Sequence, residues 1–110
     1  MATYKRYGNF SADGTEFITT DPKTPRPWIN YLSNGRYCLI ISQGAGGFSY
    51  YLDPGVHRLT RWTPAGYLSD KPGRFLYLKD EVSGKFWSAT FQPVKRYDSY
   101  ECRHGLGYTK

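Results

Sequence analysis

Glycine and proline interrupt this sequence so often that no long regular helix fits between them. Twelve glycines and seven prolines are spread over 110 residues. The apolar residues between them form short runs or alternate with polar ones, which is typical of strands rather than of amphipathic helices. Several short strands joined by frequent turns predict an all-β fold, an antiparallel β-sandwich. A chain of this length forms one domain or part of one, so residues 1–110 are expected to make a single sandwich segment.

The middle of the chain predicts a β-hairpin. Residues 37–41 are a continuous apolar run, which is typical of a strand covered on both faces. Residues 48–52 form a second strand-like run, and the glycine-rich residues 44–47 between the two favour a hairpin turn. The Asp-Pro-Gly sequence at residues 53–55 ends the second strand with ordinary turn chemistry.

A second hairpin is predicted further along the chain. Residues 74–79 and 86–91 are rich in aromatic side chains and flank a loop at residues 80–85 that contains Ser-Gly. Alternation along the second of these strands places three side chains on one face. These are Trp87, Ala89 and Phe91.

Three more strands are expected, at residues 16–20, at residues 58–62 and from Tyr100 onward. The last one runs close to Lys110. An open end of this kind suggests a domain cut within a sheet, although a terminal edge strand has the same pattern. Residues 21–27 contain three prolines, each of which fixes φ, so they predict a rigid connection.

The net charge of +6 is compatible with nucleic-acid binding. The basic residues are scattered, however, and the adjacent pairs are Lys5-Arg6 and Lys95-Arg96. This pattern favours a mixed, soluble surface without a nucleic-acid partner, and it leaves anionic ligands as an open alternative.

Cysteine content and hydropathy favour a cytoplasmic protein. Cys38 and Cys102 lie in apolar or alternating stretches, where two buried thiols are more common than a disulfide in a cytosolic protein. The N-terminus lacks the apolar core of a signal peptide. The longest apolar run, residues 37–41, is too short to cross a membrane.

No constellation of residues predicts catalysis. Residues 44–47 are followed by a strand rather than by the helix that a nucleotide site requires. Cys102 and His104 share a strand face, but a metal site needs three or four ligands, so a packed thiol and a hydrogen-bonded histidine are favoured. Glu101 and Arg103 share the opposite face, where an ion pair is expected. No carboxylate pair stands in an apolar stretch as glycoside hydrolysis requires, so on these residues alone the chain is not an enzyme.

The aromatic content of 18% is the more suggestive feature. Flat rings stack on the apolar faces of sugars while polar side chains bind the hydroxyl groups. Burial in the core is the commoner role for any single ring. The candidates for a sugar-binding surface are Trp28, Tyr31, Phe48, Tyr50, Tyr51 and Trp62.

Several ordered motifs of the chain resemble the opening of the disaccharide phosphorylases of glycoside hydrolase family 94, the cellobiose and chitobiose phosphorylases. They run over nearly the whole chain at consistent spacing. The motifs include Tyr7-Gly8-Asn9-Phe10, Pro27-Trp28-Ile29-Asn30-Tyr31-Leu32, Gly46-Gly47-Phe48-Ser49-Tyr50-Tyr51, Pro72-Gly73-Arg74-Phe75-Leu76-Tyr77-Leu78 and Arg103-His104-Gly105-Leu106-Gly107-Tyr108.

The resemblance implies a much longer enzyme, in which this N-terminal β-sandwich precedes a helical linker and an (α/α)6 barrel beyond residue 110. It implies inverting phosphorolysis of a β-linked disaccharide or short oligosaccharide, with inorganic phosphate as co-substrate and no cofactor. The catalytic acid and the phosphate site belong to the barrel, so no catalytic residue carries over to this chain. The sandwich is expected to take part in a homodimer and to contribute loops near the sugar. The expected substrate contacts are Gln43, Phe48, Tyr50, Arg58 and Arg61.

Two other functions stay open at this point. A free-standing carbohydrate-binding β-sandwich would bind sugar without chemistry, but it needs a complete sandwich. A single-stranded nucleic-acid binder fits the basic and aromatic composition but lacks an organised basic groove.

Overall fold

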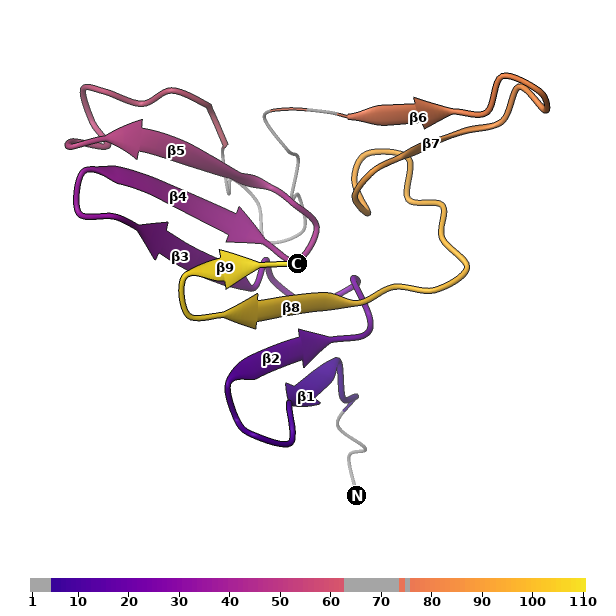
Figure 1. The fold of residues 1–110 in the computed structure, drawn as a ribbon, viewed down its shortest axis with the longest axis horizontal. Coiled ribbons are helices and arrows are strands. Elements are labelled where there is room, and N and C mark those ends of the chain that lie inside the picture. The colour runs from indigo at the N-terminus through magenta and orange to yellow at the C-terminus, as the bar shows by residue number, and fades with distance from the viewer. Residues whose placement is uncertain (1–4, 63–73, 75) are drawn as a thin grey trace.

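The computed structural model describes residues 5–62, 74 and 76–110 of the chain. Within these ranges it contains nine strands, all paired antiparallel, and no helix (Figure 1). Consequently these ranges hold no helix long and apolar enough to cross a membrane. The all-β, antiparallel prediction is confirmed, and the strands form three sheets.

The first sheet joins the two ends of the chain. Its strands β1 (Gly8–Phe10), β2 (Glu16–Thr19), β8 (Cys102–Gly105) and β9 (Tyr108–Thr109) lie in the order β1-β2-β8-β9. The strand predicted at residues 16–20 is therefore confirmed. The single strand predicted from Tyr100 onward is wrong, because the chain folds back at Gly107, whose φ of +83° glycine adopts readily. The result is the hairpin β8–β9.

The second sheet confirms the central hairpin. Its strands β3 (Ile29–Ser33), β4 (Tyr37–Ser42) and β5 (Gly47–Tyr51) follow one another in space as they do in sequence. Ile40 faces Phe48 across the hairpin, and the amides of Gly55 and Val56 donate to the Asp53 carboxylate in the turn that follows. The expectation of a strand covered on both faces is wrong for the described part of the chain, because residues 39–41 are only half-buried.

The third sheet is the hairpin of β6 (Tyr77–Lys79) and β7 (Phe86–Ser88). Its turn is organised by Asp80, whose carboxylate accepts hydrogen bonds from the backbone and hydroxyl of Ser83. Both strands are shorter than predicted, and Phe75 lies outside the described residues. β7 ends at Ser88 because its hydroxyl donates to the carbonyl of Thr90 at 2.6 Å, so the chain turns there instead of extending to Phe91.

The strand predicted at residues 58–62 is wrong beyond its first residue. Arg58 forms one bridge with Tyr50 of β5, and the amide of Leu59 donates to the carbonyl of Ser49 at 2.8 Å. At the next position the Thr60 hydroxyl accepts from the Ser49 amide at 2.9 Å. A side chain thereby takes the place of a backbone carbonyl, and the ladder ends.

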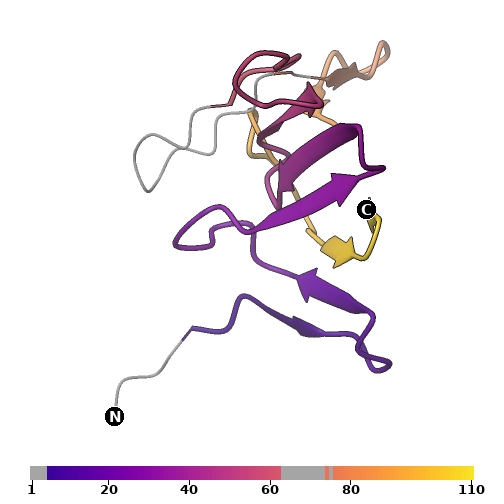
Figure 2. The same ribbon diagram turned by 90° about the vertical axis from the view of Figure 1, so that its left-hand side faces the viewer.

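Polar side chains join the first two sheets. The Asn30 amide of β3 donates to the carbonyls of Gly105 and Tyr108, both at 2.8 Å, and to the Thr109 hydroxyl at 3.0 Å. Figure 1 shows β9 and β8 below β3, with β2 and β1 further below, and Figure 2 keeps this order after a turn of 90°. His104 of β8 adds a bond from its Nε2 to the carbonyl of Trp28 at 3.1 Å.

Candidate functional site

An arginine and three aromatic rings meet beside β5. Phe48 and Tyr50 lie two residues apart on this strand and therefore on the same face, with ring centroids 6.1 Å apart. The Arg58 guanidinium carbon lies 4.4 Å from the centroid of the Phe48 ring, which is a cation–π geometry. Trp62 stacks on Phe48 at a centroid distance of 6.5 Å. We call these four residues the β5 face.

The β5 face presents charge to solvent and buries most of its aromatic surface. Arg58 is exposed, Phe48 is half-buried, and Tyr50 and Trp62 are buried. Arg61 is also exposed. A sugar at this face would therefore meet the Arg58 guanidinium and the open part of the Phe48 ring.

Tyr50 lies over a small polar cluster. Its hydroxyl bonds the Tyr31 hydroxyl, and the nearby Cys38 thiol lies 3.1 Å from the Ser33 hydroxyl. The hydrogen bonds to Tyr31 and then Cys38 raise the pKa of Tyr50 above its usual value. The hydrogen bond from Ser33, followed by those from the two tyrosines, lowers the pKa of the Cys38 thiol. The Tyr50 hydroxyl is thus fixed by its neighbours and stays protonated.

Gln43 holds the proline-rich connection rather than facing solvent. Its Oε1 accepts the amide of Trp28 at 2.8 Å, and its Nε2 donates to the carbonyl of Pro22 at 3.1 Å and to the Thr24 hydroxyl at 2.6 Å. Its own carbonyl accepts the Tyr100 hydroxyl. Among the predicted substrate contacts, the structure therefore brings Phe48, Tyr50 and Arg58 into mutual contact, whereas the recorded bonds of Gln43 are to other parts of the chain.

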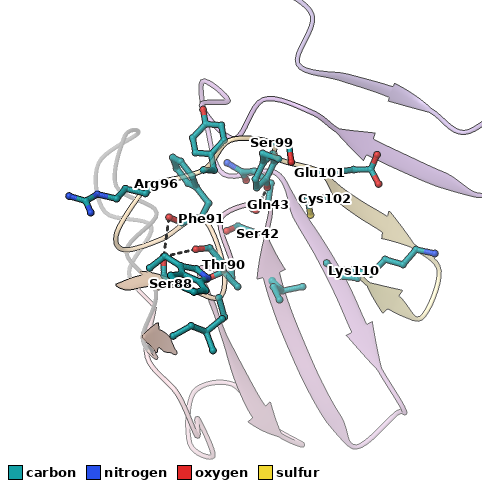
Figure 3. Close-up of a pocket in the computed structure, with 18 residues that line it drawn as sticks. Ser42, Gln43, Ser88, Thr90, Phe91, Arg96, Ser99, Glu101, Cys102 and Lys110 are labelled. Atoms are coloured by element: carbon teal, nitrogen blue, oxygen red, sulfur yellow. Dashed lines mark hydrogen bonds between the residues drawn. The ribbon is translucent and has the colours of Figure 1, made fainter. Parts of the chain in front are cut away.

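A cleft that the sequence analysis did not identify opens between β4, the β6–β7 hairpin and the segment before β8 (Figure 3). Its volume is about 510 Å³. Its aromatic lining comes from Trp87, Phe91, Tyr97 and Tyr100, and the last three contact one another edge to face at 5.5–6.1 Å. We call this space the aromatic cleft.

The aromatic cleft depends on a chain turn that the sequence pattern hides. If residues 86–91 formed one strand, Trp87 and Phe91 would share a face. In the structure β7 ends at Ser88, and Phe91 packs with Tyr97 and Tyr100 instead. The cluster of aromatic residues around positions 86–100 was the available signal, but it does not reveal which ring stays exposed.

The described carboxyl groups whose pKa values are shifted are all shifted downward, among them Asp13, Glu16 and Glu101. Hydrogen bonds from Tyr108, Lys110 and Arg103, in that order of effect, lower the pKa of Glu16 to about 2. These groups are stable anions near neutral pH, and none of them fits a general acid, which needs a raised pKa. The predicted ion pair between Glu101 and Arg103 is confirmed, at 2.5 Å.

The predicted roles of the cysteines and of His104 are confirmed. Cys38 and Cys102 are free and buried. His104 is hydrogen-bonded through Nε2 to Trp28 and through Nδ1 to the Thr109 hydroxyl, 3.0 Å away. Burial lowers the pKa of His104. No group of three His, Cys, Asp or Glu side chains converges as a metal site in residues 5–62, 74 and 76–110.

Comparison with known proteins agrees with this all-β architecture. The family model of the glycosyl hydrolase 94 supersandwich domain matches residues 15–110. An N,N'-diacetylchitobiose phosphorylase from Vibrio furnissii is 44% identical over 108 residues, which are 96% of this chain and 13% of that protein.

Two phosphorylases from Paenibacillus borealis are also similar. A solabiose phosphorylase is 38% identical over 94% of this chain and 14% of its own length. A 3-O-beta-D-glucopyranosyl-beta-D-glucuronide phosphorylase is 41% identical over 94% of this chain and 12% of its own length. The chain thus spans between 12% and 14% of the length of these three relatives.

Proposed function

The chain belongs to glycosyl hydrolase family 94, and from this membership we propose that it is the N-terminal sandwich segment of an inverting phosphorylase of β-linked disaccharides. The observation that carries the proposal is the match of nearly the whole chain to relatives named as phosphorylases of three different disaccharides. In the proposed reaction inorganic phosphate attacks the anomeric carbon from the face opposite the leaving sugar. Inversion of a β-linkage then yields an α-configured sugar 1-phosphate.

Under this proposal the catalytic groups belong to other parts of the enzyme. A helical linker and an (α/α)6 barrel follow residue 110 and supply the acid that protonates the glycosidic oxygen and the phosphate-binding groups. Phosphate is itself an anionic nucleophile, so the reaction needs no second carboxylate as base. The low pKa values of Glu16 and Glu101 agree with a segment that supplies no general acid.

We place the sugar-facing part of the segment at the β5 face, with Arg61 beside it. Arg58 and Arg61 offer planar donor groups that suit pairs of sugar hydroxyls, and Phe48 offers ring surface. Tyr50 acts through the position of Phe48 and Arg58, and Gln43 acts through the connection at residues 22–28. In the homodimer that we propose for the enzyme, this face lies near a sugar site.

The proposal is tested on the native gene product that carries residues 1–110. The protein is incubated with inorganic phosphate and either N,N'-diacetylchitobiose or cellobiose, and the products are followed by phosphorus NMR. We expect an α-configured sugar 1-phosphate from at least one β-linked disaccharide. Free sugars without a sugar phosphate, or a β-configured sugar phosphate, would contradict the proposal.

A further inference from the structure

The aromatic cleft has the size and lining of a small-ligand site. Its volume of about 510 Å³ lies within the roughly 300–1,000 Å³ typical of such sites. Its walls come from four parts of the chain: the end of β4 with the turn after it, the β6–β7 hairpin with residues 89–91, residues 96–102, and residues 109–110. Figure 3 shows Ser42, Gln43 and Cys102 from opposite walls lying close together, whereas the Arg96 side chain points away from them.

Trp87 is an exposed ring of this cleft that packs against no other aromatic ring of the described residues. Its side chain is 39% exposed. Phe91, Tyr97 and Tyr100 instead pack edge to face against one another. A large exposed indole in the wall of a cleft is a suitable platform for the apolar face of a flat ligand, because covering it removes apolar surface from water.

Polar groups beside this platform have unused hydrogen-bonding capacity. The Tyr97 hydroxyl, the Ser99 hydroxyl and the Trp87 indole N–H bond no other group within the described ranges. Tyr97 is 43% exposed, and both Tyr97 and Ser99 line the cleft. The Gln43 side chain, by contrast, is already occupied by three hydrogen bonds. The cleft therefore combines an apolar platform with free hydroxyl groups, which is the pairing that a pyranose ring requires.

We propose that the aromatic cleft binds a pyranose ring of a β-linked glycan, with Trp87 stacking on the sugar and the hydroxyl groups of Tyr97 and Ser99 bonding its edge. This inference rests on the proposed function for the class of sugar. The aromatic cleft would be a sugar-binding site separate from the β5 face, because none of the cleft residues belongs to the β5 face.

The test observes Trp87 directly in the native gene product. The protein is labelled with 5-fluorotryptophan, and the fluorine signal of Trp87 is assigned by its loss in Trp87→Phe. N,N'-diacetylchitobiose and cellobiose are then titrated separately without phosphate. We expect the Trp87 signal to shift and saturate with at least one of them.

Two nearly isosteric variants test the polar contacts. Loss of one hydrogen bond is expected to weaken the binding seen at Trp87 by up to about tenfold in Tyr97→Phe or Ser99→Ala. Tyr37→Phe is the matched control, because Tyr37 is 41% exposed and does not line the cleft. It should leave the titration unchanged.

A Trp87 signal that stays in place with both sugars overturns the inference and indicates that another part of the polypeptide covers the indole. The inference is also overturned if both Tyr97→Phe and Ser99→Ala bind the sugar at Trp87 as tightly as the wild-type protein does. The phosphorolysis assay on the same preparation decides the proposed function separately, so the two proposals fail in distinguishable ways.

Discussion

At the scale of single residues, Glu16 ties the first sheet together through one carboxylate. Its side chain is 8% exposed, and its oxygens lie 3.0 Å from Arg103 and 2.9 Å from Lys110. The Tyr108 hydroxyl donates to it at 2.6 Å. One residue of β2 thus meets β8, β9 and the residue that follows β9, which makes the carboxylate a structural group of this sheet.

Replacing this carboxylate should destabilise the fold in a pH-dependent way. The pKa of Glu16 is lowered from 4.5 to about 2, so its stabilisation is present above pH 4.5 and is lost as the pH falls toward 2. Glu16→Gln should therefore lower the melting temperature at pH 7, and the difference from wild type should shrink at pH 3. Glu81→Gln is the control. It removes the exposed ion pair between Glu81 and Lys79, whose atoms are 3.9 Å apart, and should have little effect on the melting temperature at either pH.

Arg58 is the residue that most directly tests the role given to the β5 face. In the phosphorylase that we propose for the native gene product, Arg58→Ala should raise the KM for the acceptor sugar in the synthetic direction by about tenfold, as expected for the loss of a charge-assisted hydrogen bond. Arg36→Ala removes an exposed arginine outside the β5 face and should leave this KM unchanged. Equal KM values for wild type and Arg58→Ala would show that Arg58 does not contact the acceptor sugar.

At the scale of elements, the β4–β5 hairpin depends on a close backbone approach. Gly47 has a φ of +145°, and a Cβ placed there would lie 1.8 Å from the carbonyl oxygen of Ile40. Alanine would meet both an unfavourable backbone conformation and a clash with the neighbouring strand. The first residue of β5 is therefore restricted to glycine.

Gly47→Ala should destabilise the protein by at least about 2 kcal/mol in denaturant unfolding. Gly14→Ala is the control, since Gly14 also has a positive φ, of +72°, but a Cβ there meets nothing within 4 Å. It should cost about 1 kcal/mol. Equal decreases in the free energy of unfolding for Gly47→Ala and Gly14→Ala would show that the clash with Ile40 does not contribute to the destabilisation.

The hydrogen bond of His104 between the first two sheets should make the stability of the protein sensitive to mild acid. Burial lowers the pKa of His104 below 6.5, so the unfolded chain binds the proton more readily than the folded one. The contribution of the neutral imidazole is complete above pH 6.5 and is lost as the pH falls below it. The melting temperature should decrease between pH 7 and pH 5, and His104→Gln should flatten this decrease. The same change at the exposed residue His57 should leave it intact.

Local sequence chemistry predicted some elements well and missed others for physical reasons. The β4–β5 hairpin was predictable because residues 44–47 encode its turn locally. The strand at residues 58–62 was not, because the Thr60 hydroxyl ends the ladder through a contact with Ser49. The aromatic cleft depends on residues from four parts of the chain, and no local pattern shows that they converge.

At the scale of the whole molecule, many large apolar side chains of the described residues are exposed. The β6–β7 hairpin alone presents Leu76, Tyr77, Leu78, Phe86 and Trp87 at 39–65% exposure. A two-stranded hairpin is only marginally stable in water without further packing. This agrees with the proposal that the segment works within a longer enzyme.

The intact mass of the native gene product, measured by mass spectrometry on protein purified from its source cells, tests the central claim most directly. The account predicts a mass far above the 12.7 kDa of these 110 residues, because the catalytic barrel that we propose would be part of the same polypeptide. A mass near 12.7 kDa would contradict it and leave a sandwich that binds sugar without phosphorolysis.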